Sequence, residues 1–109
     1  MILHTAFSDF VMQEEMIIEF LLKTLDQEES DKIQALLCTG IAKLMLAGFI
    51  SNDKVLESLV LVYVSPQTAQ NLELRQCLSY FFPVYCYSSP ANQRRMQKVS
   101  NASLMNQEN

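Results

Sequence analysis

Two stretches of the chain decide its fold: IQALL at residues 33–37 and LRQCL at residues 74–78. They lie 41 residues apart, and each belongs to a run in which apolar residues recur every three or four positions, as in a helix that buries one face. The same shift places Ile18 on Leu59. A period of about 40 residues built from two antiparallel helices is typical of HEAT-type repeats. We therefore predict an all-α, HEAT-like solenoid segment of antiparallel helix pairs, with an ordinary helical bundle as the alternative.

Composition is consistent with one small helical domain. The chain has 109 residues, 50% hydrophobic and 18% charged, which is enough apolar surface for a core and too much for a disordered segment. Two glycines and three prolines are too few for the turns of an all-β fold. No apolar stretch approaches the ~20 residues that a membrane-spanning helix needs. The first residues lack the basic segment of a signal peptide, so we expect the chain inside the cell.

Local signals mark where the first helices begin and end. Apolar runs at residues 2–11 and 16–25 predict two helices, with a turn between them near residues 13–15. A polar, acidic segment follows, in which Ser30 or Asp31 is expected to cap the next helix.

The middle of the chain carries two further helical patterns. In the helix predicted over residues 33–45, Gly40 lies mid-helix, where it suggests a close crossing by a neighbouring helix, and Gly48 fits a C-terminal cap. Residues 55–63 are rich in β-branched side chains, but their spacing and the polar Ser-Asn-Asp before them favour a helix over a strand. That helix should end before Pro66.

The last third predicts a helix over residues 72–85, kinked or broken at Pro83, and a short final helix with Pro90 in its first turn. We expect a HEAT-repeat segment at residues 1–99, with helix pairs at about 15–48 and 52–87. Residues 100–109 should form a polar, frayed tail.

Three motifs stand out beyond this periodicity: LCTGIAKLMLAG at residues 37–48, LVLVYVSP at residues 59–66, and LRQCLSYFFPVY at residues 74–85, the last followed by SSPANQ. They resemble EGLCKLLLSGR, LLLLYFNP and LRQCLSVFFPVYA of the HEAT-repeat subunit family of condensin, the family called G-type or subunit 3. The third motif is the most specific, and the resemblance covers roughly residues 15–95.

The resemblance implies a fold and a function. Condensin is an ATP-driven complex that compacts chromosomes in mitosis. Its G-type subunit is a curved HEAT solenoid that binds the kleisin subunit and, together with it, double-stranded DNA. It has no catalytic activity and no cofactor of its own, and neither a membrane nor a small-molecule substrate is implied. The implied location is the nucleus and the chromosome, with a cytoplasmic pool.

Two departures qualify the resemblance. Phe49 stands where the family has an arginine after the glycine, so any role of that charge is lost or moved. The family proteins are also many times longer, so we expect an excised fragment, a truncated gene product or a divergent short copy. The alternative function is a stand-alone α-helical adaptor that binds a partner helix.

A basic cluster near the end of the chain is the candidate DNA contact. Its members are Arg94, Arg95 and Lys98, which fall on one side of the last helix and could neutralise phosphates. An ordinary solvated face is the alternative. Because the net charge is -4, DNA binding would depend on this patch or on other parts of an assembly.

The second helix of each HEAT pair lines the concave surface of the stack, so polar residues there are candidate partner contacts. They are Lys32, Thr39, Lys43, Arg75 and Gln76. For Arg75 a structural role is the alternative, as an ion pair with Asp26 or Glu28 of the preceding repeat.

Other candidates favour structural roles. The helical spacing of the aromatic residues predicts core positions rather than base stacking, for Tyr80, Phe81, Phe82, Tyr85 and Tyr87. Cys38, Cys77 and Cys86 follow apolar helical patterns and are expected to be buried free thiols.

No catalytic arrangement is recognisable in the sequence. His4, the single histidine, cannot supply a triad or a metal cluster by itself. Glu14, Glu15 and Glu19 are expected on a solvated helix face. Two glycines cannot form a phosphate-binding loop. We therefore predict a protein without enzymatic activity, metal or cofactor.

Overall fold

The computed structural model describes the backbone of residues 2–108 and the side chains of residues 13–103. Within these residues the chain is helical and contains no strand, as the sequence predicts. Its elements are α1 (Ile2–Gln27), α2 (Asp31–Leu46), α3 (Asp53–Val64), the short 3-10 helix η1 (Pro66–Thr68), α4 (Leu72–Ser88) and α5 (Pro90–Glu108).

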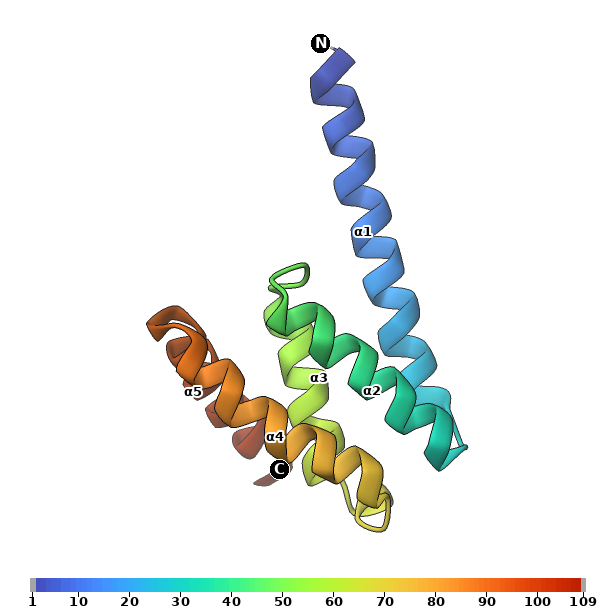
Figure 1. The fold of residues 1–109 in the computed structure, drawn as a ribbon, viewed down its shortest axis with the longest axis vertical. Coiled ribbons are helices and arrows are strands. Elements are labelled where there is room, and N and C mark those ends of the chain that lie inside the picture. Colours follow the sequence, from blue (N-terminus) through green and yellow to red (C-terminus); the bar gives the residue numbers. More distant parts are fainter. Residues whose placement is uncertain (1, 109) are drawn as a thin grey trace.

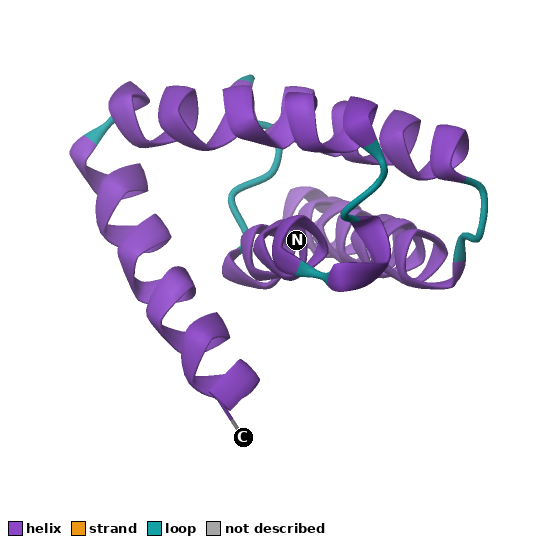
Figure 2. Ribbon diagram, turned by 90° about the horizontal axis from the view of Figure 1, so that it is seen from below, coloured by secondary structure: helices purple, strands orange, loops and turns teal. Residues whose placement is uncertain are grey.

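The helices are arranged in two layers (Figures 1 and 2). Helices α2 and α4 lie side by side in one layer and run in the same direction, while α1 and α3 form the other layer. Each layer-crossing pair, α1 with α2 and α3 with α4, is antiparallel. Helix α5 leaves the end of α4 and packs against both α3 and α4. This is the stacking of a HEAT-like solenoid segment, and the predicted fold class is confirmed.

The core lies between the two layers. Leu56 and Leu59 from α3 and Leu74 and Leu78 from α4 have no exposed surface, and Cys38 of α2 is equally enclosed. Burial of each such leucine contributes about 1.5–3 kcal/mol to folding. The layers are therefore held together mainly by apolar contact, in the manner expected of stacked repeats.

Helix starts were predictable because their caps are local. The side chain of Ser30 accepts a hydrogen bond from the backbone N–H of Ile33, and that of Asn52 accepts one from Lys54. Asn71 caps α4 in the same way, through the N–H of Leu74. Helix α3 ends at Val64, and Pro66 begins η1, as expected of the residues before a proline.

Gly48 ends α2 with a Schellman motif. The N–H of Phe49 reaches the carbonyl of Leu44 at 2.9 Å, and the N–H of Gly48 reaches that of Met45 at 3.1 Å. The motif requires the φ of +84° that Gly48 adopts, a conformation unfavourable for any residue with a Cβ. The predicted C-terminal cap is confirmed.

The turn predicted near residues 13–15 is wrong, because α1 runs unbroken from Ile2 to Gln27. This stretch contains no glycine or proline, and Gln13, Glu14 and Glu15 are good helix formers. In Figure 1 the N-terminal half of α1 projects beyond the other helices. The apolar stripe predicted over residues 2–11 lies outside the residues whose side chains are described.

The break considered at Pro83 does not occur either, since α4 continues through it to Ser88. Proline leaves the carbonyl of Ser79 without its helical donor. Both Pro83 and Ser79 are exposed, so water can satisfy that carbonyl. The buried neighbours Phe81 and Tyr85 hold the helix on either side of the proline.

Helix α5 is longer than the short helix predicted, because residues 100–108 continue it to Glu108. Val99 and Ser103 are buried, at 4% and 2% exposure. Packing against α3, rather than the polar local sequence, holds this part of the helix.

Candidate functional site: an exposed helical layer and a basic cluster

The candidate partner residues on α2 share one exposed face. Lys32 and Lys43 are exposed, and Thr39 is half-buried with its hydroxyl donating to the carbonyl of Ala35 at 2.8 Å. Leu36 lies on the same side of α2 and is 63% exposed. This face points away from the core of the molecule, where a partner could reach it.

Arg75 does not join that face. Its guanidinium lies over the ring of Tyr63, 4.8 Å from the centroid, and donates to the Tyr63 carbonyl at 3.0 Å. The prediction that Arg75 pairs with Asp26 or Glu28 is wrong. The guanidinium is held instead by Tyr63 of α3, the helix paired with α4. Gln76, the remaining candidate, is exposed on α4.

Two aromatic residues expected in the core are on the surface instead. Phe81 and Tyr85 are buried and stacked, with ring centroids 5.3 Å apart, and Phe82 packs edge-on against Phe81. Tyr80 and Tyr87 are 69% and 89% exposed. Helical spacing could have predicted this difference. The buried positions 74, 78, 81 and 85 define one stripe of α4, and residues 80 and 87 lie on the opposite side.

Tyr80 holds the position on α4 that Thr39 holds on α2, one repeat earlier. Because α2 and α4 are parallel neighbours, the residues exposed at these positions lie on one side of the layer. We call it the layer face, made of Lys32, Leu36, Thr39, Lys43, Tyr80 and Tyr87. It combines two lysines with apolar and aromatic surface, and its exposed tyrosines are of a residue type that is enriched at protein interfaces.

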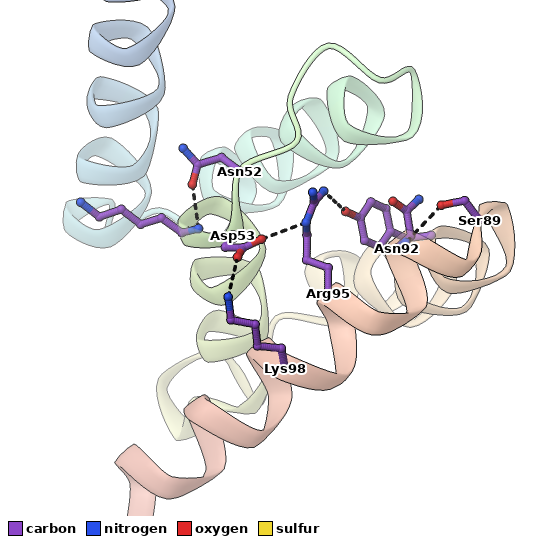
Figure 3. A network of polar contacts seen from close by, with 8 residues as sticks. Asn52, Asp53, Ser89, Asn92, Arg95 and Lys98 are labelled. Carbon is purple, nitrogen blue, oxygen red and sulfur yellow. Dashed lines mark hydrogen bonds and ion pairs between the residues drawn. The ribbon is translucent and has the colours of Figure 1, made fainter.

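The basic cluster on α5 forms an ion-pair network (Figure 3). The guanidinium Nε of Arg95 lies 2.8 Å from the carboxylate of Asp53 at the start of α3, and Lys98 lies 3.4 Å from the same carboxylate. Arg95 also donates to the hydroxyl of Tyr85 at 3.1 Å. One arginine therefore connects α3, α4 and α5.

The electrostatics of the cluster follow from these contacts. The hydrogen bond with Tyr85 raises the pKa of the Arg95 guanidinium, and the nearby Asp53 adds to this, while burial acts in the opposite direction. Two of the three predicted phosphate contacts are thus already near a carboxylate. Arg94 is exposed, and among the residues with described side chains none forms an ion pair with it.

The cysteines are all free thiols, but only Cys38 is buried, whereas Cys77 and Cys86 are half-buried. Burial, with a smaller contribution from Cys77, raises the pKa of Cys38 to about 12. The expectation of three buried thiols is therefore correct for one of them.

The remaining candidates are the acidic residues of α1 and the single histidine. Glu14, Glu15 and Glu19 are exposed, as expected of a solvated face. The side chain of His4 lies outside the described residues. In the part of the chain that the structure describes, no group of three metal-ligating side chains comes together, and no helix is both long and apolar enough to cross a bilayer.

Comparison with known proteins identifies the family. Residues 4–106 match the family described as nuclear condensing complex subunits, C-terminal domain. The chain belongs to this family of condensin subunits.

Relatives in several species agree with this assignment. Condensin complex subunit 3 of Schizosaccharomyces pombe is 31% identical over 105 residues, which is 96% of this chain and 12% of the relative. The human and Saccharomyces cerevisiae proteins of the same name are 34% and 37% identical over 83 residues, which is 76% of this chain and 8% of each relative. The chain therefore spans about a tenth of the length of these condensin subunits.

Proposed function

We propose that the chain is a non-catalytic scaffold segment of a condensin complex, and that it takes part in mitotic chromosome condensation by holding other subunits. The observation that supports this is the family match across residues 4–106, together with relatives named as condensin complex subunits. The solenoid fold suits such a role, because stacked helix pairs offer extended surfaces for partners. By the same reasoning we propose a nuclear and chromosomal location.

The partner proposed for the layer face is the kleisin subunit. Lys32 and Lys43 would contact acidic groups, and Leu36 would add apolar contact. Tyr80 and Tyr87 would supply the aromatic anchors, a residue type that often carries much of the binding energy. Thr39 and the exposed Gln76 are further candidates at this surface. Arg75 supports the surface by holding α4 on α3.

A pull-down tests this proposal. The subunit that contains this segment is expected to retain a kleisin fragment, and the double substitution Tyr80→Ala and Tyr87→Ala is expected to weaken retention by 10-fold or more, in line with two interface anchors. Because both residues are exposed, the fold should survive, as circular dichroism would show. Retention unchanged by these substitutions would exclude the layer face. Capture of an unrelated amphipathic helix in place of kleisin would favour an adaptor.

Double-stranded DNA is the second proposed partner, through Arg94, Arg95 and Lys98 in the assembled complex. Arg94 is the informative position, because Arg95 and Lys98 are also paired with Asp53, so a substitution at either would change an ion pair as well as a DNA contact. Arg94→Glu is expected to weaken DNA binding at low salt and to reduce the salt dependence by about one phosphate contact. Lys23→Glu, the same change of charge at an exposed position on α1, is the control. DNA affinity insensitive to Arg94→Glu would remove the basic cluster from the proposal.

A further inference from the structure

One carboxylate holds two of the three cations of the basic cluster (Figure 3). The Nε of Arg95 lies 2.8 Å from Oδ1 of Asp53, and the Nζ of Lys98 lies 3.4 Å from Oδ2. Each oxygen of the carboxylate therefore has its own cation. Arginine and lysine also bind a phosphate through its separate anionic oxygens. Asp53 thus takes the position between Arg95 and Lys98 from which a phosphate could contact both.

The two ion pairs are open to water and can be exchanged. Side-chain exposure is 29% for Arg95, 77% for Lys98 and 48% for Asp53. Ion pairs exposed to this extent are weak, because water and dissolved ions screen them. A phosphate that approaches both cations can therefore displace the carboxylate at little cost in stability.

Arg95 has a second contact that holds it when the carboxylate is displaced. Its Nη1 donates to the hydroxyl of Tyr85 at 3.1 Å, and Tyr85 is only 2% exposed because it packs in the core. Val99, four residues later on α5, is also buried. These contacts fix the guanidinium without Asp53. Release of the ion pair therefore leaves a preorganised cation at the surface.

The charges around the ion pairs balance. A hollow of about 540 Å³ lies beside them, and its lining includes Glu14 and Glu15 of α1 together with Asp53 and Arg95. These three carboxylates equal in number the three cations of the basic cluster, so this part of the surface carries no net charge that would attract DNA from a distance. Only Arg94 is exposed and outside both ion pairs.

We propose that Asp53 is an internal counter-ion that competes with DNA phosphates for Arg95 and Lys98 and thereby lowers the DNA affinity of this segment. The inference rests on the proposed contact of the basic cluster with double-stranded DNA. Cations of a protein gain free energy on DNA because they release condensed counter-ions from the phosphates. A cation that must first leave a carboxylate gains less, and the freed carboxylate repels the phosphates nearby. Asp53 therefore reduces both the affinity and its dependence on salt.

The variant Asp53→Asn tests this in the assembled condensin complex that contains this segment. Asparagine keeps the shape of the side chain and removes its charge. We expect binding of a double-stranded oligonucleotide, followed by fluorescence anisotropy in about 50 mM salt, to become about 3–10-fold tighter. The slope of log affinity against log salt should steepen by about 1–2, because up to two cations become available for phosphates. Asp53→Ser should give the same gain, so the result does not depend on the folding of one variant.

Asp31→Asn is the matched control. Asp31 is the first residue of α2, directly after the N-cap Ser30, just as Asp53 is the first residue of α3, directly after Asn52. Asp31 is exposed and belongs to neither of the ion pairs found among the described side chains. The control removes the same charge from the same position of a helix, and we expect it to change DNA affinity by less than about twofold.

A double-mutant cycle shows whether the gain acts through the two cations. The combined exchanges Arg95→Gln and Lys98→Gln should weaken DNA binding by less than about 3-fold while Asp53 is present, because both cations are then already paired. In the Asp53→Asn background the same exchanges should weaken it by about 10-fold. Asp53→Asn should correspondingly give no gain once both cations have been replaced.

An affinity of Asp53→Asn equal to that of Asp31→Asn would overturn the proposal. A gain that persists with Arg95→Gln and Lys98→Gln would overturn it as well, because the gain would then reflect net charge alone. Arg94→Glu separates these results from the proposed function. If Arg94→Glu weakens binding and Asp53→Asn has no effect, the DNA contact stands and the counter-ion does not. If neither variant has an effect, the DNA contact itself fails.

Discussion

Replacing Asn71 with alanine removes a side chain that connects two successive repeats. Asn71 is 5% exposed, and its Oδ1 accepts the N–H of Leu74 at 3.3 Å, which caps α4. Its Nδ2 donates to the carbonyl of Asp31 at 2.9 Å, at the beginning of α2. Loss of a cap costs about 1 kcal/mol, and loss of a buried hydrogen bond costs about 1 kcal/mol more. We expect Asn71→Ala to lower the free energy of unfolding by about 2 kcal/mol, or the melting temperature by roughly 8–16 °C.

Two further variants separate the contributions. Asn71→Ser keeps a capping oxygen but loses the donor to the carbonyl of Asp31, so it should lower the free energy of unfolding by about 1 kcal/mol. Asn52→Ala removes the cap of α3, whose oxygen accepts from Lys54 at 2.7 Å within the same helix, and should also cost about 1 kcal/mol. Urea denaturation followed by circular dichroism measures all three. If Asn71→Ala costs no more than Asn52→Ala, the contact between repeats contributes nothing to stability and the reasoning is refuted.

Three other predictions follow from the structure. Asp53→Ala should lower the free energy of unfolding by less than about 1 kcal/mol, because the ion pairs of Asp53 with Arg95 and Lys98 are partly exposed, and this loss should be smaller in 1 M salt. A larger loss in urea denaturation that does not depend on salt would contradict this. Gly48→Ala should cost about 1–2 kcal/mol because of the positive φ, and an unchanged midpoint would show that the Schellman turn is dispensable. At pH 8 iodoacetamide should label Cys38 far more slowly than Cys77, because a pKa of about 12 leaves little thiolate until the pH approaches that value; equal rates in the native protein would refute the burial argument.

Helix type and helix boundaries could be predicted where the determining contacts are local. Ser30 and Asn52 cap helices through hydrogen bonds that span two or three residues, and Pro66 and Gly48 end helices through their own backbone geometry. The repeat could also be predicted from the sequence, because a helix that buries one face has apolar residues at helical spacing in each helix pair. The expected turn in α1 was wrong because the polar residues 13–15 are a break in hydrophobicity and not in helix propensity.

The candidate sites were harder to predict, because each depends on which helices become neighbours. The sequence pattern grouped Arg94, Arg95 and Lys98, but Asp53, which pairs with two of them, lies on another helix about 40 residues away. Arg75 likewise contacts the ring and the carbonyl of Tyr63 on α3, and not an acidic side chain. Tyr80 and Tyr87 could have been assigned to the surface had the register of α4 been applied strictly to all of its aromatic residues.

The helical fold, the positions of the caps and the repeat of the helix pairs all follow from the amino-acid sequence, because they depend on hydrogen bonds within a few residues and on the period of the apolar positions. Tertiary structure alone decided which equivalent positions are covered. Leu74 is buried and Ile33 is open although both occupy the same place in the repeat, because burial is a property of the neighbouring helix and not of the residue.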